Sequence, residues 1–350
     1  MEQVRRVTLS DVSKAAGVGV ATVSRALAGA DHPDVNPETR KRVRKVAKEL
    51  GYRPSATARA LRTGAYRSLS VVVPDMAWGW WEPVIRSAYQ AAAREGYKLL
   101  VHPIAGTEGG VAAVIRDLVN VPTDGVLVFG SAGDTAVRDA ADRINLPIAI
   151  IDDVATDVVL PTIAANNRSG ARLAVEHLIS QGRRRIAVLR TAEDGEFVRQ
   201  RLAGYFDAIK AAGIPRDDRL IVHFAEAMDE SVRTWQPLHD LLESALGFDG
   251  LFCIADFMAA PAIRTLHAAG RAVPRDVSIV GFDDERAAQL LDPPLTTVRQ
   301  PYEAMGESAV QLLLRSISGE KLALSRIELD THLVVRHSTE KSLTSSVPNG

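Results

Sequence analysis

Hydrophobic and polar positions follow two different patterns along the chain, with a change near residue 68. The first 50 residues hold short stretches with apolar residues at helical spacing, and glycines follow these stretches at Gly17, Gly29 and Gly51. From residue 68 on, short apolar runs of strand length alternate with amphipathic stretches of helical length. The pattern predicts a small helical domain followed by a larger α/β part.

The helical domain is expected to begin with two short helices joined by a tight turn. Thr8 is a favourable N-cap, and Asp11 stands three residues on, where it can stand in for the usual Glu or Gln of a capping box. A turn with Gly17 and Gly19 leads into a second helix over residues 20–28. This arrangement is typical of a helix-turn-helix, whose second helix enters the major groove of DNA.

A third helix is predicted to begin at Asn36 as its cap, with Pro37 in the first position. Its polar face carries five basic residues: Arg40, Lys41, Arg44, Lys45 and Lys48. On its own, such a face is ordinarily just solvated. A dinucleotide-binding turn at residues 17–19 is disfavoured, because a helix precedes it and Thr22 replaces the third glycine.

The second part of the chain predicts parallel sheets covered by helices on both faces. Strands are expected over residues 69–73, 98–104, 125–129, 147–151, 185–189, 220–224, 250–255 and 277–281. Helices are expected over residues 83–95, 168–181, 197–212, 257–269 and 302–317. About 270 residues exceed one comfortable hydrophobic core, so two α/β lobes are predicted.

Charge divides the chain in the same place. Residues 1–67 contain 14 Lys and Arg against 6 Asp and Glu, a net charge of +8, whereas the whole chain has a net charge of −1. The remaining residues therefore carry −9. A basic head on an acidic body indicates that the head binds a polyanion.

Composition excludes several classes of protein. No apolar run approaches the ~20 residues of a membrane helix, and the N-terminal residues lack the apolar core of a signal peptide, so a cytoplasmic protein is expected. Cys253 is the only cysteine, which excludes an internal disulfide or a cysteine-based zinc site, and its apolar surroundings predict an inert buried thiol. No cofactor and no metal are expected.

Four segments, residues 7–18, 21–27, 35–40 and 50–54, strongly resemble the lactose-repressor (LacI/GalR) family. The resemblance implies a DNA-binding domain over residues 1–53, with base reading by Val20, Ala21 and Arg25. Arginine can bind guanine in a bidentate way, and the two small residues offer apolar contacts. Positions that face phosphates or support the reading helix fall on Thr8, Thr22, Ser24, Asn36 and Thr39.

Residues 54–67 contain an alanine-rich stretch that could form only a marginal helix alone. The resemblance implies a hinge helix that folds on the operator and pairs with its copy in a second subunit. Leu61 would insert into the minor groove, Ala58 would contact the other helix, and Arg59 and Arg62 would lie near the DNA backbone. An ordinary linker is the alternative.

For residues 68–337 the resemblance implies a periplasmic-binding-protein-like core with a ligand between its lobes, and a disordered tail over residues 338–350. Ligands of open α/β sheets bind beyond the carboxyl ends of the strands. The candidate residues there are Asp75, Trp78, Trp80, Trp81, Asp152, Asp256 and Asp283, and Arg201 matches the pocket arginine of the family. Aspartates and an arginine that hold hydroxyls, with tryptophan faces over C–H groups, favour a sugar.

The sequence therefore predicts a homodimeric transcription regulator, a repressor by preference, which binds a palindromic operator under the control of a small effector. A purine or nucleoside effector, or an effector that promotes DNA binding, remains open. A sugar-uptake receptor would need an export signal and no basic head. An enzyme is disfavoured because no nucleophile elbow, zinc-protease motif or phosphate loop is present.

Overall fold

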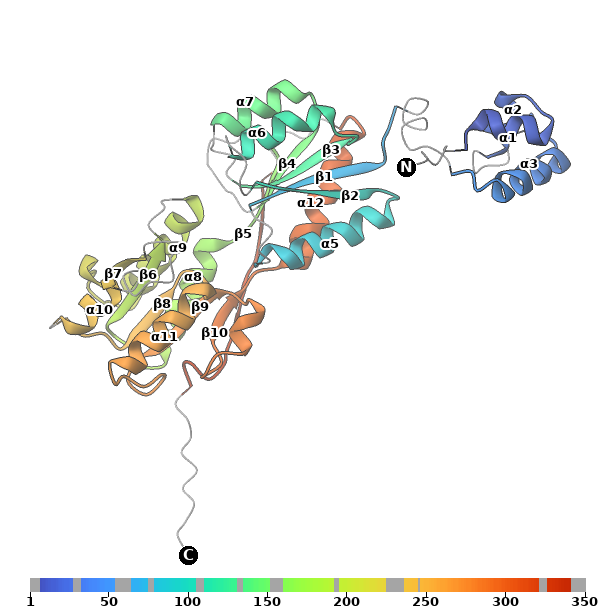
Figure 1. The fold of residues 1–350 in the computed structure, drawn as a ribbon. Helices are drawn as coiled ribbons and strands as arrows, with labels where there is room; N and C mark the ends of the chain where they lie inside the picture. Colours follow the sequence, from blue (N-terminus) through green and yellow to red (C-terminus); the bar gives the residue numbers. More distant parts are fainter. Residues whose placement is uncertain are drawn as a thin grey trace, which may run out of the picture. The chain divides into compact units, whose positions relative to one another are not determined.

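A computed structural model describes residues 7–27, 33–53, 64–74, 79–104, 110–130, 135–151, 160–191, 195–224, 236–244, 246–320 and 326–340. The chain forms two compact units, which divide between Tyr66 and Arg67 (Figure 1).

The first unit is built from three helices, α1 (Leu9–Ala16), α2 (Val20–Ala26) and α3 (Pro37–Glu49). All three predicted helices are confirmed, although the predicted end of the second lies beyond the described residues. Their core consists of small side chains: Val12, Ala16, Val23, Ala26, Val35, Val43 and Ala47. Gly17 ends α1 with a φ of 62°, a left-handed conformation that glycine adopts without strain.

The second unit contains two lobes, each built on a six-stranded sheet. In the first sheet the order is β11-β5-β4-β3-β1-β2, and all of its pairs are parallel. Its strands are β1 (Ser68–Val73), β2 (Lys98–Pro103), β3 (Gly125–Phe129), β4 (Ile148–Ile151), β5 (Thr162–Ala165) and β11 (Arg326–Leu329). Helices α5 (Trp81–Arg94) and α12 (Tyr302–Ile317) cover one face, and α6 (Gly110–Asp117) and α7 (Thr135–Ile144) cover the other.

The second sheet has the order β12-β10-β9-β8-β6-β7, with only β12 antiparallel to its neighbour among the described strands. Its strands are β6 (Ile186–Thr191), β7 (Ile221–Phe224), β8 (Gly250–Cys253), β9 (Ser278–Asp283), β10 (Thr296–Arg299) and β12 (His332–Val334). The helices of this lobe are α8 (Asn167–Ser180), α9 (Glu196–Ala211), α10 (Gln236–Glu243) and α11 (Ala259–Ala268). Cys253 is buried in its core, as expected.

Three connections join the lobes: β5 to α8, β10 to α12, and β11 to β12. The chain thus leaves the first lobe, builds most of the second, and returns to complete the first with α12 and β11. This topology brings the carboxyl ends of β8, β9 and β10 to the lobe junction.

The two-lobed prediction is confirmed, and eight strands lie where they were expected. The structure adds β5, β10, β11 and β12, short strands whose threonine, arginine, glutamate or histidine residues interrupt the apolar run. It also adds α6, α7 and α10.

The predicted disordered tail begins too early. Ser338 and Thr339 are buried, and the Ser338 hydroxyl donates to the Ile279 carbonyl oxygen at 2.6 Å while it accepts the Thr296 N–H at 2.8 Å. The polar side chains of Ser338 and Thr339 suggested a solvated tail. The Ser338 hydroxyl instead forms hydrogen bonds with backbone groups of β9 and β10. Residues 341–350 lie outside the described residues.

We expect Gly306→Ala to destabilise the first lobe, because a Cβ at this position of α12 would lie 2.3 Å from the Val84 carbonyl oxygen and 2.7 Å from the Ala88 nitrogen of α5. Both clashes are with backbone, so the helices must move apart, at a cost of about 1–3 kcal/mol. Urea unfolding measures the change. Gln311→Ala, on the exposed face of α12, is the matched control and should change the unfolding free energy by less than about 0.5 kcal/mol; equal effects of the two variants would contradict the close packing.

Candidate nucleic-acid interface and ligand site

The side chains expected to read bases lie on the solvent face of α2. This face exposes Val20, Ala21 and Arg25, and Val20 is 46% exposed. The opposite face of the helix buries Val23 and Ala26 in the core of the unit. Helical periodicity produces this division. The first helical turn of α2 and Arg25 in its last turn therefore present one continuous surface.

Arg25 has an acidic neighbour. Its guanidinium lies 3.7 Å from the Asp34 carboxylate, and both side chains are about half exposed. Ion pairs of this kind are worth little in water. The ion pair with Asp34 is therefore too weak to prevent Arg25 from binding a stronger partner such as a DNA base.

The caps of α1 and α3 have the residues that the sequence predicts. The Thr8 hydroxyl accepts the Asp11 N–H at 3.3 Å, and the Asp11 carboxylate accepts the Thr8 backbone N–H at 2.8 Å, which completes the capping box. Asn36 accepts the Thr39 N–H at 2.7 Å. Contact of Thr8, Asn36 and Thr39 with DNA phosphates stays a prediction. Thr22 and Ser24 are partly buried on α2.

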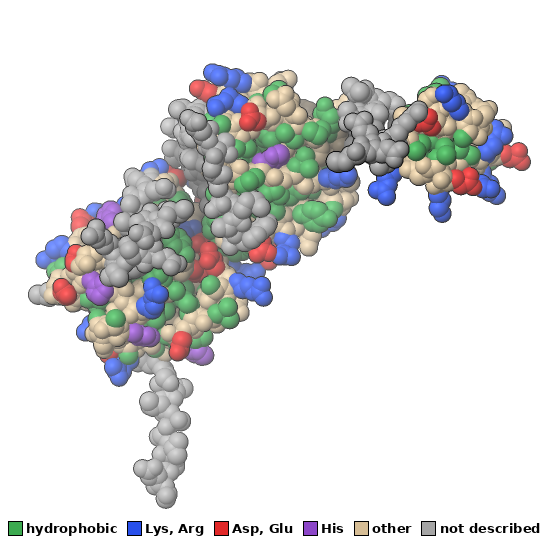
Figure 2. All heavy atoms as spheres, in the orientation of Figure 1, with side chains coloured by type: hydrophobic (Ala, Val, Ile, Leu, Met, Phe, Trp, Pro, Cys, Tyr) green, Lys and Arg blue, Asp and Glu red, His purple; other side chains and the backbone are tan. Residues whose placement is uncertain are grey.

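Lysine and arginine side chains are distributed over the first unit (Figure 2). The hinge residues Ala58, Arg59, Leu61 and Arg62 lie outside the described residues, so their roles stay predictions.

In the second unit, polar side chains gather at the carboxyl ends of β8, β9 and β10. Asp256 follows β8, Asp283 ends β9, and Gln300 follows β10. All three are buried. The Asp256 carboxylate accepts the Thr297 hydroxyl at 2.6 Å and the Glu285 N–H at 2.9 Å. Asp256 and Asp283 thus lie where the strand-end rule places them.

Arg201 reaches this group from α9 and is 3% exposed. Its Nε donates to the Asn167 side chain at 2.8 Å, one terminal nitrogen donates to the Ile254 carbonyl oxygen, and the other lies 3.3 Å from the Asp283 carboxylate. The guanidinium also lies 3.6 Å from the centre of the Phe282 ring. Arg201 and Asp283 therefore form a buried ion pair, supported by further hydrogen bonds on the arginine.

Asp283 has further partners from the connection between the lobes. Gln300 Nε2 donates to its carboxylate at 2.7 Å, and the Tyr302 hydroxyl donates to its carbonyl oxygen. Burial raises the pKa of Asp283 to about 6, although Arg201 opposes the shift. Burial and the charge of Asp283 together raise the pKa of Asp256 well above its usual range.

Glu285 connects the two lobes and was not among the predicted site residues. Its N–H donates to the Asp256 carboxylate at 2.9 Å, and both Glu285 and Trp80, the residue before α5, line the cavity between the lobes. The backbone of Trp80 interacts favourably with the ionised Glu285 carboxylate, so Glu285 of the second lobe faces the start of a helix of the first. Burial and the charge of Asp283 raise the pKa of Glu285 to about 7.

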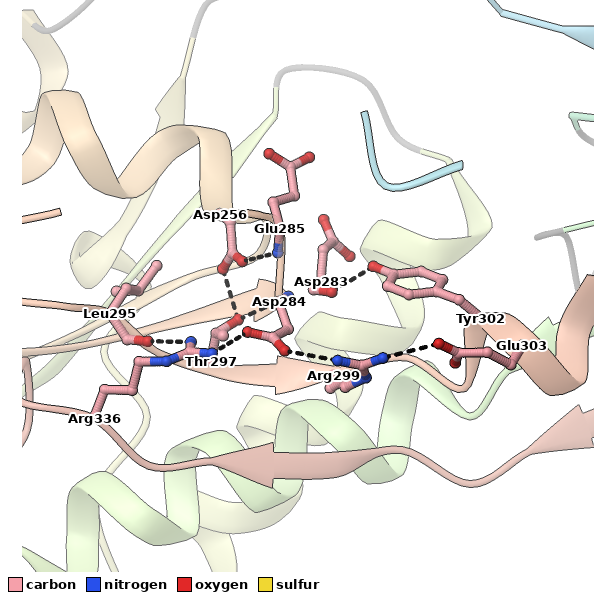
Figure 3. Close-up of polar contacts among 10 residues, drawn as sticks. All are labelled: Asp256, Asp283, Asp284, Glu285, Leu295, Thr297, Arg299, Tyr302, Glu303 and Arg336. Carbon is pink, nitrogen blue, oxygen red and sulfur yellow. Dashed lines mark hydrogen bonds and ion pairs between the residues drawn. The ribbon is translucent and has the colours of Figure 1, made fainter. Parts of the chain in front are cut away.

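Asp284 faces the opposite way from Asp283 and Glu285 (Figure 3). Positive φ angles at Asp283 and Asp284, 116° and 54°, turn the chain at the end of β9. The Asp284 carboxylate lies 2.6 Å from Arg336 and 3.5 Å from Arg299. Two arginines thus compensate this buried charge.

A cavity of about 530 Å³ lies at the junction of the lobes beside this group. Trp80, Glu285 and Tyr302 are among its lining residues, and the Trp80 and Tyr302 rings stack with centroids 6.2 Å apart. Trp81 does not line this cavity and packs edge-on to Trp80 against the core. Contact with a ligand therefore stays a prediction for both tryptophans.

Asp75, Trp78 and Asp152 lie outside the described residues. The structure brings Arg201, Asp256 and Asp283 together and adds Glu285, Gln300 and Tyr302 to the group. The rule of strand ends could have indicated Gln300 if β10 had been recognised. Nothing local in the sequence indicates the contact of Glu285 with Trp80.

The described residues contain no group of three His, Cys, Asp or Glu side chains placed to hold a metal ion. In the same part of the chain, no helix is long and apolar enough to span a membrane.

Comparison with known proteins extends over nearly the whole chain. Residues 8–55 match the bacterial regulatory proteins of the lacI family, and residues 175–339 match a periplasmic binding protein-like domain. The chain is 32% identical to the HTH-type transcriptional repressor CytR of Escherichia coli strain K12, over 97% of this chain and 98% of the relative. The chain belongs to the lacI family of bacterial regulatory proteins.

Other members of the lacI family agree with this assignment. The HTH-type transcriptional regulator CelR of Thermobifida fusca is 34% identical, over 97% of this chain and 100% of the relative. A lac repressor dimer bound to operator and the anti-inducer ONPF is similar with a TM-score of 0.83 at 26% identity, over 96% of this chain and 99% of that one. A CelR–cellobiose complex is similar with a TM-score of 0.69 at 32% identity, over 95% and 100%. The first unit is the helix-turn-helix domain of a transcription regulator, and the two lobes are its periplasmic-binding-protein-like core.

We expect Glu285 and Asp283 to contribute a fall in the free energy of unfolding of this lacI-family protein as pH rises from about 5 to 7.5, whereas His102 and His177, whose pKa values burial lowers, contribute in the opposite direction. The pKa of Glu285 rises from 4.5 to about 7 on folding, and that of Asp283 from 3.8 to about 6, so the folded state binds more protons. This stabilisation is full below the ordinary pKa values and is lost as pH rises through the folded ones.

Glu285→Gln should make this decline shallower between about pH 5.5 and 7.5, since the amide does not titrate. Denaturant unfolding at a series of pH values measures it. Glu95→Gln, an exposed substitution after the other end of α5, serves as control and should keep the wild-type slope. A wild-type slope in Glu285→Gln would contradict the burial of this carboxyl.

Proposed function

We propose that this chain is a homodimeric repressor whose affinity for a palindromic operator is controlled by a small hydroxylated effector bound between the lobes. The observation that carries the proposal is the match over 96% of the chain to a repressor solved as a dimer on its operator with a small molecule bound. The DNA-reading surface and the ligand group are thus parts of one chain.

On the DNA side, two copies of α2 would enter successive major grooves about one helical turn apart, which requires a palindromic site for a twofold dimer. Val20, Ala21 and Arg25 would contact base edges, and the caps of α1 and α3 would orient the unit on phosphates. The hinge segment, with Leu61 as the wedge, would set the spacing of the two units.

On the ligand side, Arg201, Asp256 and Asp283 would hold hydroxyl groups, and Trp80 would cover an apolar face. The CelR–cellobiose complex, a similar structure, supports a sugar as the effector. The effector would release the operator to the extent that it binds the released form better than the DNA-bound form.

The protein would act in the cytoplasm, where the operator lies, and would bind its effector without converting it. The buried polar side chains at the strand ends support this part of the proposal. Asp256, Asp283 and Arg201 are all engaged with neighbouring residues of the chain, and the Thr297 hydroxyl that donates to Asp256 is itself fully buried.

Arg25→Ala should weaken binding to the cognate operator by about 1–3 kcal/mol and relax the preference at one base position, because a bidentate contact to guanine is lost. Fluorescence anisotropy on an operator selected from genomic fragments measures both effects. Lys48→Ala, on the basic face of α3, is the control and should keep the base preference. An equal loss for Arg25→Ala on random DNA would contradict base reading.

A thermal-shift screen of mono- and disaccharides, nucleosides and purines should identify the effector, since a ligand that binds only the folded state raises the melting temperature. Trp80→Ala, which removes a ring that lines the cavity, should lose that shift and the release of operator, while operator binding without ligand is kept. A purine or nucleoside that responds instead of a sugar would correct the effector class. If no genomic DNA fragment is bound under any ligand condition at modest salt, the proposal that this chain is a transcription regulator is refuted.

A further inference from the structure

We propose that the ligand site of this chain accepts an uncharged, hydroxyl-rich compound and rejects the phosphorylated or carboxylated form of the same compound. The inference rests on the proposed function, because it specifies the ligand of the same site. Four observations on the described residues carry it.

The first observation is the gathering of three carboxyl groups at the lobe junction. Asp256, Asp283 and Glu285 come from the ends of β8 and β9, and Asp283 and Glu285 point to the same side (Figure 3). Asp283 lies close enough to the other two for its charge to raise the pKa of both Asp256 and Glu285. Acidic side chains also gather near the lobe junction in Figure 2. An additional anion at this place would be repelled.

The second observation is that the nearest cation is already neutralised. Arg201 is paired with Asp283, and its other described bonds go to Asn167 and the Ile254 carbonyl oxygen. An anionic ligand would have to take this guanidinium from Asp283 and leave a buried carboxylate without its cation. Removing one partner of a buried ion pair is far more costly than the pair is worth.

The third observation concerns the other arginines at the junction. Arg299 and Arg336 both lie against Asp284, on the opposite side of the turn that ends β9, and Arg299 also pairs with Glu303 (Figure 3). Neither Asp256 nor Glu285 has an ion-pair partner among the described residues. Arg86 and Arg286 also line the cavity at this junction, but both are exposed to solvent and Arg86 pairs with Glu82. The buried part of the described group therefore offers no uncommitted arginine to a phosphate.

The fourth observation is an acceptor that lacks a donor. Gln300 is fully buried, and its Nε2 donates to Asp283, but its Oε1 has no hydrogen-bond partner in the described structure. A buried acceptor without a donor is unfavourable, so the group favours a ligand that brings O–H donors. Hydroxyls supply such donors, whereas ionised phosphate and carboxylate groups supply only further acceptors.

The experiment compares matched pairs of compounds with the full-length protein at pH 8. The pairs are cellobiose and cellobionate, ribose and ribose 5-phosphate, and cytidine and cytidine 5′-monophosphate. Thermal shift finds the pair that binds, and calorimetric titration then gives both affinities. We expect the uncharged member to bind more than about tenfold tighter than its anionic counterpart. An anionic member that binds as tightly as its uncharged counterpart, or more tightly, would overturn the proposal.

Variants connect the discrimination to the named carboxyls. Glu285→Gln removes a negative charge while it keeps an acceptor oxygen that can face the Trp80 backbone, so it should reduce the ratio of the two affinities. Asp256→Asn is the second variant, and Glu95→Gln is the control that should leave the ratio unchanged. A wild-type ratio in both Glu285→Gln and Asp256→Asn would overturn the assignment to this group.

A parallel operator-release assay separates this inference from the function on which it rests. If an anionic compound binds and releases the operator, the inference of an uncharged ligand is wrong, but the proposed regulatory function is supported. If the uncharged compounds bind with the expected discrimination but DNA binding never responds, the ligand class stands and the regulatory function is wrong.

Discussion

The buried pair of Arg201 and Asp283 is the interaction on which the second unit depends most. Each side chain is about 3% exposed, and neither charge could be buried there without the other. Through its bonds Arg201 joins α9 to the start of α8 and to the residue after β8. Asp283 joins β9 to the connection that leads into α12. The pair therefore holds together segments from distant parts of the chain beside the junction of the lobes.

Glu285 extends this network into the first lobe. Asp256 accepts its N–H, and its carboxylate interacts favourably with the backbone of Trp80 at the start of α5. α5 in turn packs closely along α12. A change at the strand ends can thus reach the helices of the other lobe through a few polar contacts, without a deformation of either sheet.

The sequence predicts most of the fold because long helices and buried strands have strong periodicities. Thr8, Gly17, Asn36 and Pro37 mark the ends of the helices in the first unit, and all of them act as expected. β11 and β12 were missed because they hold three or four residues each, with intermediate or full exposure. Ser338 was assigned to a tail because its polar side chain gives no local sign of a partner in β9 or β10.

The candidate site was predicted in part, for a related reason. Asp256 and Asp283 follow apolar runs that are recognisable as strands, so their place at the carboxyl edge could be inferred. Arg201 was located only through resemblance to a family, because nothing in the helix around it marks an inward-facing arginine. Glu285 depends on a contact between lobes, which no local pattern contains.

The return of the chain to its first lobe has a consequence for synthesis on the ribosome. α12 covers one face of the first sheet and β11 forms its edge, yet both are translated after β6 to β10 of the second lobe. Until α12 has been translated, part of the apolar face that α5 and α12 share therefore stays uncovered in the nascent first lobe. Chaperones that shield such surfaces should bind this stretch of the growing polypeptide. The two lobes cannot fold one after the other as independent domains.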